Sequence, residues 1–243
     1  MKAEEKIKAI SRHVASVYRR FDRAFKNYPK DILDLIVFHK FHFFMPEDDA
    51  LQAYRRLKTS FVDWNEVRIS SVKEIQEIFD GVPDALEIAI FVKDFLEFLH
   101  RENQSVSLEF LTQKTLAEIR RYLKQVKGIE PATISLVLLL RKEHPVFPLS
   151  APMERSLVRV GVLRRGDTRD HKERFLHGLL DVEQALPFHH FFLQHSREVC
   201  PPEEEKLQCP SCRIRAACSF FRRRSRRLNG RLNHAAALKK GKS

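Results

Sequence analysis

Residues 116–140, LAEIRRYLKQVKGIEPATISLVLLL, decide the fold of this chain. An amphipathic helix is predicted up to Val126, and Pro131 is placed to open a second, very apolar helix. The residues between the two helices are expected to form a tight hairpin of Lys127, Gly128, Ile129 and Glu130. This arrangement points the free backbone N–H groups of a helix N-terminus at a phosphate group. An ordinary packing corner between two helices is the alternative, because all-helical domains contain many such corners.

Helical signals extend over most of the chain. With seven glycines in 243 residues, a β-fold with many tight turns is excluded. Apolar residues recur at three- and four-residue steps over 4–27, and Pro29 ends that helix. A nearly all-apolar helix is predicted over 31–44 and ends at Pro46. Further helices are predicted over 47–59, 71–79, 83–100 and 108–125. The predicted fold class is therefore all-α.

The cysteines lie close together near the end of the sequence, with the spacing C-x8-C-x2-C-x5-C. They are Cys200, Cys209, Cys212 and Cys218. A chain of this length folds without disulfides, so clustered thiols indicate metal ligands. The spacing alone leaves both zinc and an iron–sulfur cluster open, because structural zinc usually takes two C-x2-C pairs and only one is present.

The net charge of +12 is concentrated in residues 221–243, which hold nine of the 44 basic residues and no acidic residue. Such a segment is expected to be a disordered basic tail. Its arginines are expected to attract phosphate groups in a salt-dependent way, and those nearest the cysteines are Arg222, Arg223 and Arg224. A solvated tail that only aids solubility is the alternative.

The sequence lacks the usual signals for a membrane or for export. Its longest apolar runs are too short to cross a bilayer, and its first residues, MKAEEKIKAI, are charged. We therefore expect a cytoplasmic protein with no membrane partner, associated with the nucleoid in a bacterium or archaeon.

Three segments, in this order, resemble the helix-hairpin-helix DNA glycosylases of the endonuclease III type. VKGIEPATISLVLLL (126–140) resembles that family's LPGVGRKTANVVL, and PLSAPMERSLVRVGV (148–162) occupies the place of its VDTH segment. FHHFFLQHSREVC (188–200) resembles its CHHWLILHGRYTC and leads into the cysteines. The C-x2-C-x5-C portion matches the family's ending for a 4Fe–4S cluster. The resemblance covers roughly residues 28–220.

This resemblance implies an all-α, two-lobed fold. One lobe has six helices and spans 29–143, and the other is an iron–sulfur cluster lobe built from 1–28 and 144–220. It also implies a 4Fe–4S cluster on the four cysteines, although the first gap holds eight residues where the family has six. His189, His190 and His195 are expected to pack or hydrogen-bond near the cluster rather than to bind metal.

The partner that the resemblance implies is double-stranded DNA, possibly damaged, bound by a monomer. DNA contacts are expected in the hairpin and on the helix that follows, at Lys127, Gly128, Ile129 and Thr133. Phe44 lies near the position of a glutamine that fills the gap left by a flipped base, and an aromatic wedge is one interpretation of the segment FHKFHFF (38–44). Simple core packing is the other.

The family's reactive positions are replaced in this chain. Ala132 stands where a lysine attacks the sugar, and Ser150 stands where an aspartate assists base departure. A methyl group cannot form a Schiff base, so abasic-site (AP) lyase activity is not expected. Glu154, one helical turn after Ser150, is a candidate for the lost carboxylate, against an ion pair with Arg155 or plain exposure. Glu130 replaces the second hairpin glycine and either caps the next helix or repels phosphate.

Three functions follow from these matches and departures. The first is a DNA-binding protein of base-excision repair that recognises a lesion or a DNA structure without the standard glycosylase and lyase residues. The second is an active monofunctional glycosylase that uses water and a non-standard carboxylate. The third is a non-catalytic iron–sulfur scaffold protein. Whether the chain is an enzyme stays open at this point.

Overall fold

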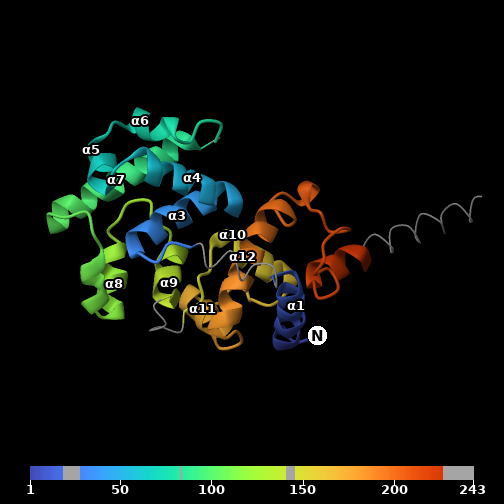
Figure 1. The fold of residues 1–243 in the computed structure, drawn as a ribbon. Coiled ribbons are helices and arrows are strands. Elements are labelled where there is room, and N and C mark those ends of the chain that lie inside the picture. Colours follow the sequence, from blue (N-terminus) through green and yellow to red (C-terminus); the bar gives the residue numbers. More distant parts are fainter. Residues whose placement is uncertain (19–27, 83, 141–145, 227–243) are drawn as a thin grey trace, which may run out of the picture. The chain divides into compact units, whose positions relative to one another are not determined.

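The computed structural model describes residues 1–18, 28–82, 84–140 and 146–226 (Figure 1). Within these ranges the regular elements are α-helices and short 3-10 helices, with no strand, which confirms the predicted all-α class. No helix in the described ranges combines the length and apolarity needed to span a bilayer. The part of the predicted tail from 227 to 243 lies outside the described residues.

The chain divides into two compact units, one of residues 23–148 and one of residues 1–22 with 149–243. The sequence predicted lobes of 29–143 and of 1–28 with 144–220. In the described part of the 23–148 unit, seven α-helices form where six were predicted. They are α3 (Ile32–Phe44), α4 (Glu47–Ser60), α5 (Trp64–Ile69), α6 (Val72–Glu77), α7 (Ala85–Asn103), α8 (Leu116–Leu123) and α9 (Pro131–Leu140), with the 3-10 helix η1 (Glu109–Gln113) before α8.

Helix α3 is the centre of this unit. Asp31 caps its N-terminus, where the carboxylate accepts hydrogen bonds from the backbone N–H groups of Leu33 and Asp34 at 2.8 and 3.1 Å. Nearly all of the helix is buried, and it packs against α4, α7 and α9. Phe41 on α3 meets Phe79 edge to face, with 4.9 Å between the ring centroids.

The predicted single helix over 108–125 is wrong, because the chain forms η1 and then a separate α8. Thr115 adopts an extended conformation and caps α8, and its side chain and that of Glu118 form a reciprocal capping box. A residue with these backbone angles cannot continue a helix from the preceding segment. The helix α5 was not predicted; it is short, and Asp63 caps it by accepting from the N–H of Glu66 at 2.9 Å.

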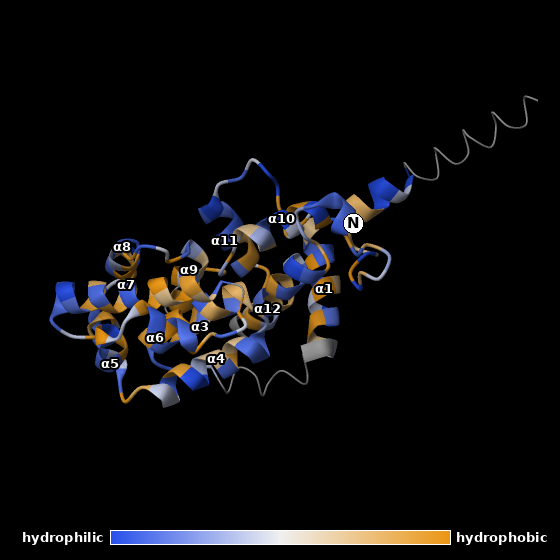
Figure 2. Cartoon of the chain, turned by 90° about the horizontal axis from the view of Figure 1, so that it is seen from above, coloured by the Kyte–Doolittle hydropathy of each residue, from blue (hydrophilic) through white to orange (hydrophobic). Residues whose placement is uncertain are grey.

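The second unit contains the chain's two ends. Its helices are α1 (Ala3–Tyr18), α10 (Ala151–Val160), α11 (Arg169–His177) and α12 (Val182–Glu198), with the 3-10 helix η2 (Glu204–Lys206). Helix α12 packs against α1 and α10, and its Phe188 and Phe192 rings lie 4.7 Å apart in the core. Helix α1 carries both apolar and polar residues, as predicted for an amphipathic helix (Figure 2), and Ile7 and Ile10 are buried.

Residues 219–226, directly after the last cysteine, are helical. This helix includes 221–226, which the sequence assigned to a disordered tail. The N–H of Arg222 donates to the carbonyl of Cys218 at 3.2 Å, so the helix continues without a break from the cysteine segment.

Candidate functional site

The hairpin between α8 and α9 is a tight turn that depends on Gly128. Its φ of +80° is in the left-handed region, where a side chain is strained. A Cβ atom added there would also lie 3.1 Å from Cδ2 of Phe91 on α7. Lys127 and Gly128 are exposed and Ile129 is half-buried, so the predicted contact residues of the hairpin are open to a partner.

A buried lysine on α3 supports this hairpin from beneath. Lys40 donates from Nζ to the carbonyl of Gly128 at 3.1 Å and to Oε1 of Glu130 at 3.0 Å. The same ammonium lies 4.8 Å from the ring centroid of Phe91 and 5.1 Å from that of Phe44. The lysine side chain is only 5% exposed. The carboxylate of Glu130 is therefore paired with an internal cation, which weakens its repulsion of phosphate.

After exposed Pro131, the first turn of α9 is buried. Thr133, a predicted DNA contact, is 2% exposed, and its hydroxyl lies 2.8 Å from Nδ1 of His39. Ala132, at the family's lysine position, is also 2% exposed. The carbonyl of Glu130 accepts the N–H of Thr133 at 2.9 Å, so this residue begins the hydrogen bonding of α9 through its backbone. The side chain of Thr133 is therefore too buried to support the DNA contact that was predicted for it.

The aromatic segment 38–44 combines both of the interpretations given above. Phe38 and Phe41 are fully buried and belong to the core. Phe44 at the end of α3 is half-buried, and its ring meets that of Phe43 edge to face at 5.6 Å. Part of the Phe44 ring thus remains open, as a wedge requires.

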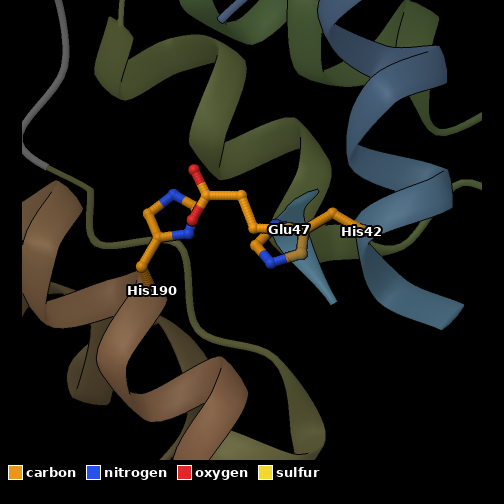
Figure 3. A group of neighbouring side chains, drawn as sticks. All are labelled: His42, Glu47 and His190. Atoms are coloured by element: carbon orange, nitrogen blue, oxygen red, sulfur yellow. The ribbon is translucent and has the colours of Figure 1, made fainter. Parts of the chain in front are cut away.

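Two further polar residues of this unit stand at the junction of α3 and α4 (Figure 3). His42 is buried on α3, and Glu47 begins α4. Burial raises the pKa of Glu47 to about 7, against an opposing hydrogen bond from Tyr28. The third side chain drawn in Figure 3, His190, comes from α12 of the other unit.

The four cysteines line one small, largely apolar cavity in the second unit, together with His195. All four are free thiols, each half-buried. The structure thus brings together the four residues predicted to hold metal. Of the three histidines predicted to lie near them, His195 lines the same cavity. Burial lowers the pKa of His195 to about 4, so this ring is neutral beside the thiols.

Hydrogen-bond donors point at every one of these sulfur atoms. Nη1 of Arg159 lies 3.5 Å from Cys200 Sγ, and the N–H of Phe221 lies 3.5 Å from Cys218 Sγ. The N–H of Ile214 bonds to Cys212, and the Arg224 side chain bonds to Cys209. Burial raises the pKa of the free thiols of Cys209 and Cys212. Burial alone thus disfavours the thiolate form, whereas the hydrogen-bond donors aimed at the sulfurs suit thiolates held by a metal.

Ser150, which was predicted to occupy the family's aspartate position, caps a helix in this chain. Ser150 is the N-cap of α10, where its hydroxyl accepts from the N–H of Met153 at 3.4 Å. Glu154 forms an ion pair with Lys172 of α11 at 2.8 Å. The alternative partner considered above, Arg155, instead donates to the carbonyls of Ser196 and Cys200.

Two lysines at these sites were missed from the sequence. Lys40 stands in a largely apolar helix that is buried along most of its length, and a cation in such a helix is itself a signal for a buried partner. Lys6 on α1 is 4% exposed, and it donates to the carbonyls of Val160 and Gly161 and to the hydroxyl of Ser219, at 2.9, 3.0 and 2.7 Å. It therefore attaches the N-terminal helix to the segment directly after Cys218.

Comparisons with known proteins were made for the whole chain. No protein-family profile matches it. It is 24% identical over 178 residues to endonuclease III of Sulfolobus acidocaldarius, covering 72% of this chain and 76% of that protein. It is 25% identical over 142 residues to a putative DNA glycosylase of Arabidopsis thaliana, covering 58% and 48%. The match to the DNA glycosylase/AP lyase ROS1 of that plant is 29% identical over 177 residues, covering 66% of this chain and 13% of the relative.

Solved structures give the same result for the fold. A trapped endonuclease III–DNA covalent intermediate superposes with a TM-score of 0.64 at 16% identity, covering 93% of this chain and all of that one. A thermostable thymine-DNA glycosylase superposes with a TM-score of 0.63 at 13% identity, covering 90% and 98%. The chain spans about half the length of the Arabidopsis glycosylase and a small part of ROS1. The resemblance predicted from the sequence is thus confirmed: the chain has the endonuclease III fold and is similar in sequence to proteins named as endonuclease III and as DNA glycosylases.

Proposed function

We propose that this protein binds double-stranded DNA and recognises a damaged base or an unusual DNA structure, as part of base-excision repair. The hairpin carries this proposal. It presents exposed Lys127 and Gly128 ahead of α9, and the ammonium of Lys127 suits a phosphate oxygen. The Lys40 ammonium balances Glu130, the one acidic residue of the hairpin. Relatives of this chain that are named as DNA glycosylases or solved with DNA support the same partner.

We further propose that the lyase reaction of the family is absent. The position of the amine nucleophile is held by buried Ala132, and that of the aspartate by Ser150 in a capping role. The substitute carboxylate, Glu154, is bound to Lys172 at 2.8 Å. An acid in such an ion pair is a poor general base for water, so a monofunctional glycosylase that relies on Glu154 is not favoured.

The cofactor proposed for the cysteine cavity is a 4Fe–4S cluster. In the described residues, no three of the cysteine sulfurs lie within 4.8 Å of one another. Zinc with Zn–S bonds of about 2.3 Å would draw its four sulfurs closer than that. A wider set of four thiols, each with an N–H donor, suits the larger cluster. When bound, the cluster links the loop after α12 to the C-terminal helix of 219–226.

Binding to short duplexes tests this function directly. Duplexes containing a normal pair, an abasic-site analogue and an oxidised pyrimidine are titrated with the protein at several salt concentrations. We expect binding to all three, tighter to the damaged duplexes, and a hairpin variant such as Lys127→Gln should weaken it. Absence of binding to every duplex by the iron-loaded protein would contradict the proposal and leave the scaffold interpretation.

A further inference from the structure

A hollow of about 510 Å³ opens in the second unit beside the cysteine cavity, with which it shares Arg159 and Phe220. Its wall includes four arginines, from α10, from the loop that follows, and from the helix of 219–226. They are Arg155, Arg159, Arg165 and Arg223. The volume is in the range of sites that hold a nucleotide-sized ligand. None of the lining residues belongs to the hairpin or to the cysteines.

Two of these arginines are fixed by neutral acceptors. Nη2 of Arg155 donates to the carbonyls of Ser196 and Cys200 at 3.1 and 3.3 Å. Nη2 of Arg159 donates to the carbonyl of Pro202 at 2.7 Å. Carbonyl groups orient a guanidinium without cancelling its charge. Arg159 also donates from Nη1 to Cys200 Sγ at 3.5 Å, and Arg155 lies in the field of Glu203, so both are positioning cations whose charge is partly shared with these groups.

The other two arginines are exposed. Neither Arg165 nor Arg223 has an ion-pair partner among the described residues. Of the two acidic residues in the wall, Glu154 is already paired with Lys172 at 2.8 Å, which leaves Glu204 of η2. The hollow therefore carries an excess of positive charge with two free guanidinium groups at hand. An anion with several acceptor oxygens matches this set.

An aromatic ring completes the wall. Phe220 is half-buried, and the guanidinium carbon of Arg159 lies 5.7 Å from its ring centroid. The arginine thereby steadies one side of the ring while part of the ring faces outward. A planar base or a sugar can rest on such a surface, which an inorganic anion alone would not use.

We propose that this arginine hollow binds a phosphate group of a DNA strand, with the attached nucleoside against Phe220. This inference rests on the proposed function and adds a second DNA contact, on a different unit from the hairpin. Arg165 and Arg223 contact the phosphate, while Arg155 and Arg159 supply the fixed positive wall. The loop between the first two cysteines is acidic and does not attract a DNA strand. The attraction comes from the arginines beside this loop.

The test compares two double variants that each lose two positive charges. In Arg165→Gln/Arg223→Gln the hollow is changed, and in Lys73→Gln/Arg101→Gln two exposed cations of the other unit are removed. Duplex affinity is measured by fluorescence anisotropy over a series of salt concentrations. We expect the magnitude of the log–log salt slope of the hollow variant to fall by about one, at roughly 0.9 for the one lost phosphate contact, and that of the control to stay near the wild type.

The outcomes separate the two proposals. If the wild-type protein binds no duplex, the proposed function fails whatever the variants do. If the wild type binds and both double variants keep its slope, the hollow is not a DNA site and the proposed function stands. Poly-glutamate serves as a probe for an acidic peptide. If the hollow variant loses binding to poly-glutamate but keeps the duplex salt slope of the wild type, the inference is also overturned. Phe220→Leu should weaken duplex binding without changing the slope, and unchanged affinity would remove the nucleoside contact.

Discussion

Lys40 and Glu130 are 90 residues apart in the sequence and form an ion pair of 3.0 Å between α3 and the hairpin. The lysine is almost fully buried, and the glutamate side chain is 26% exposed. The resemblance predicts that Glu130 stands where the related family has a glycine, and the ion pair with Lys40 compensates the charge of an acid at that position.

Removing Lys40 should therefore harm both the fold and DNA binding. We expect Lys40→Met to lower the free energy of unfolding by about 2 kcal/mol, since it leaves a partly buried carboxylate and the Gly128 carbonyl without their donor. Duplex affinity should fall as well. Urea denaturation and anisotropy measure the two effects.

The double variant Lys40→Met/Glu130→Gly supplies the control, because it removes both charges together. It should recover much of the lost affinity. If it binds as weakly as Lys40→Met, the charge of Glu130 is irrelevant to the hairpin and the pairing argument is wrong.

Gly128 offers a matched comparison with Gly81. Both have a φ near +80°, but only at Gly128 does an added Cβ meet another residue, Phe91 at 3.1 Å. Gly81→Ala should cost about 1 kcal/mol for its backbone conformation alone. We expect Gly128→Ala to cost more and to weaken duplex binding, whereas Gly81→Ala leaves binding unchanged. Equal losses of stability would show that the contact with Phe91 is unimportant.

Local patterns were sufficient for much of the fold. The apolar steps of α1, the prolines bounding α3 and the hairpin glycine each act within a few residues, and the elements they predict are present. The break before α8 was also encoded locally, by the capping box of Thr115 and Glu118, but a continuous apolar pattern concealed it.

The functional detail depended on contacts that sequence spacing does not encode. Lys40 on α3 pairs with Glu130 of the hairpin, and Lys172 on α11 pairs with Glu154 on α10, so their charges reveal no partner until the chain is folded. The same is true of the arginine wall: Arg223 appeared to belong to a tail, and only the helix of 219–226 brings it into the hollow with Arg155.

Glu47 should make stability depend on pH. Burial raises its pKa from 4.5 to about 7, so the folded protein favours the protonated form. The stabilisation is fully present below about pH 4.5 and is lost as the pH rises through 7. We expect Glu47→Gln to match the wild type near pH 4 and to exceed it by roughly 1–2 kcal/mol above pH 7, allowing for partial exposure. Glu77→Gln, at an exposed position, is the control. Thermal unfolding should show no gain in stability of this variant over the wild type above pH 7.

The cysteine cavity should give protein that is yellow-brown when purified and contains iron and inorganic sulfide. Any one Cys→Ser change, for example Cys209→Ser, should lower the iron content and the solubility, because the cluster joins the segments on either side of it. Arg159→Gln should retain less iron than Arg101→Gln, since only the former removes a donor to Cys200. Stoichiometric zinc without sulfide in anaerobically purified protein would refute the assignment.

The proposed absence of lyase chemistry can be tested by chemical trapping. Borohydride added to the protein with abasic-site or oxidised-pyrimidine DNA should yield no covalent adduct, because Ala132 replaces the amine that would form an imine. Duplex binding should survive. Ala132→Lys with Ser150→Asp should gain trapping if DNA lies as it does in the related enzymes, although Ala132 is 2% exposed and the longer side chain must displace its neighbours. An adduct with the unmodified protein would mean that another amine attacks the sugar, that the alignment through the hairpin is wrong, and that the chain is not a disabled lyase.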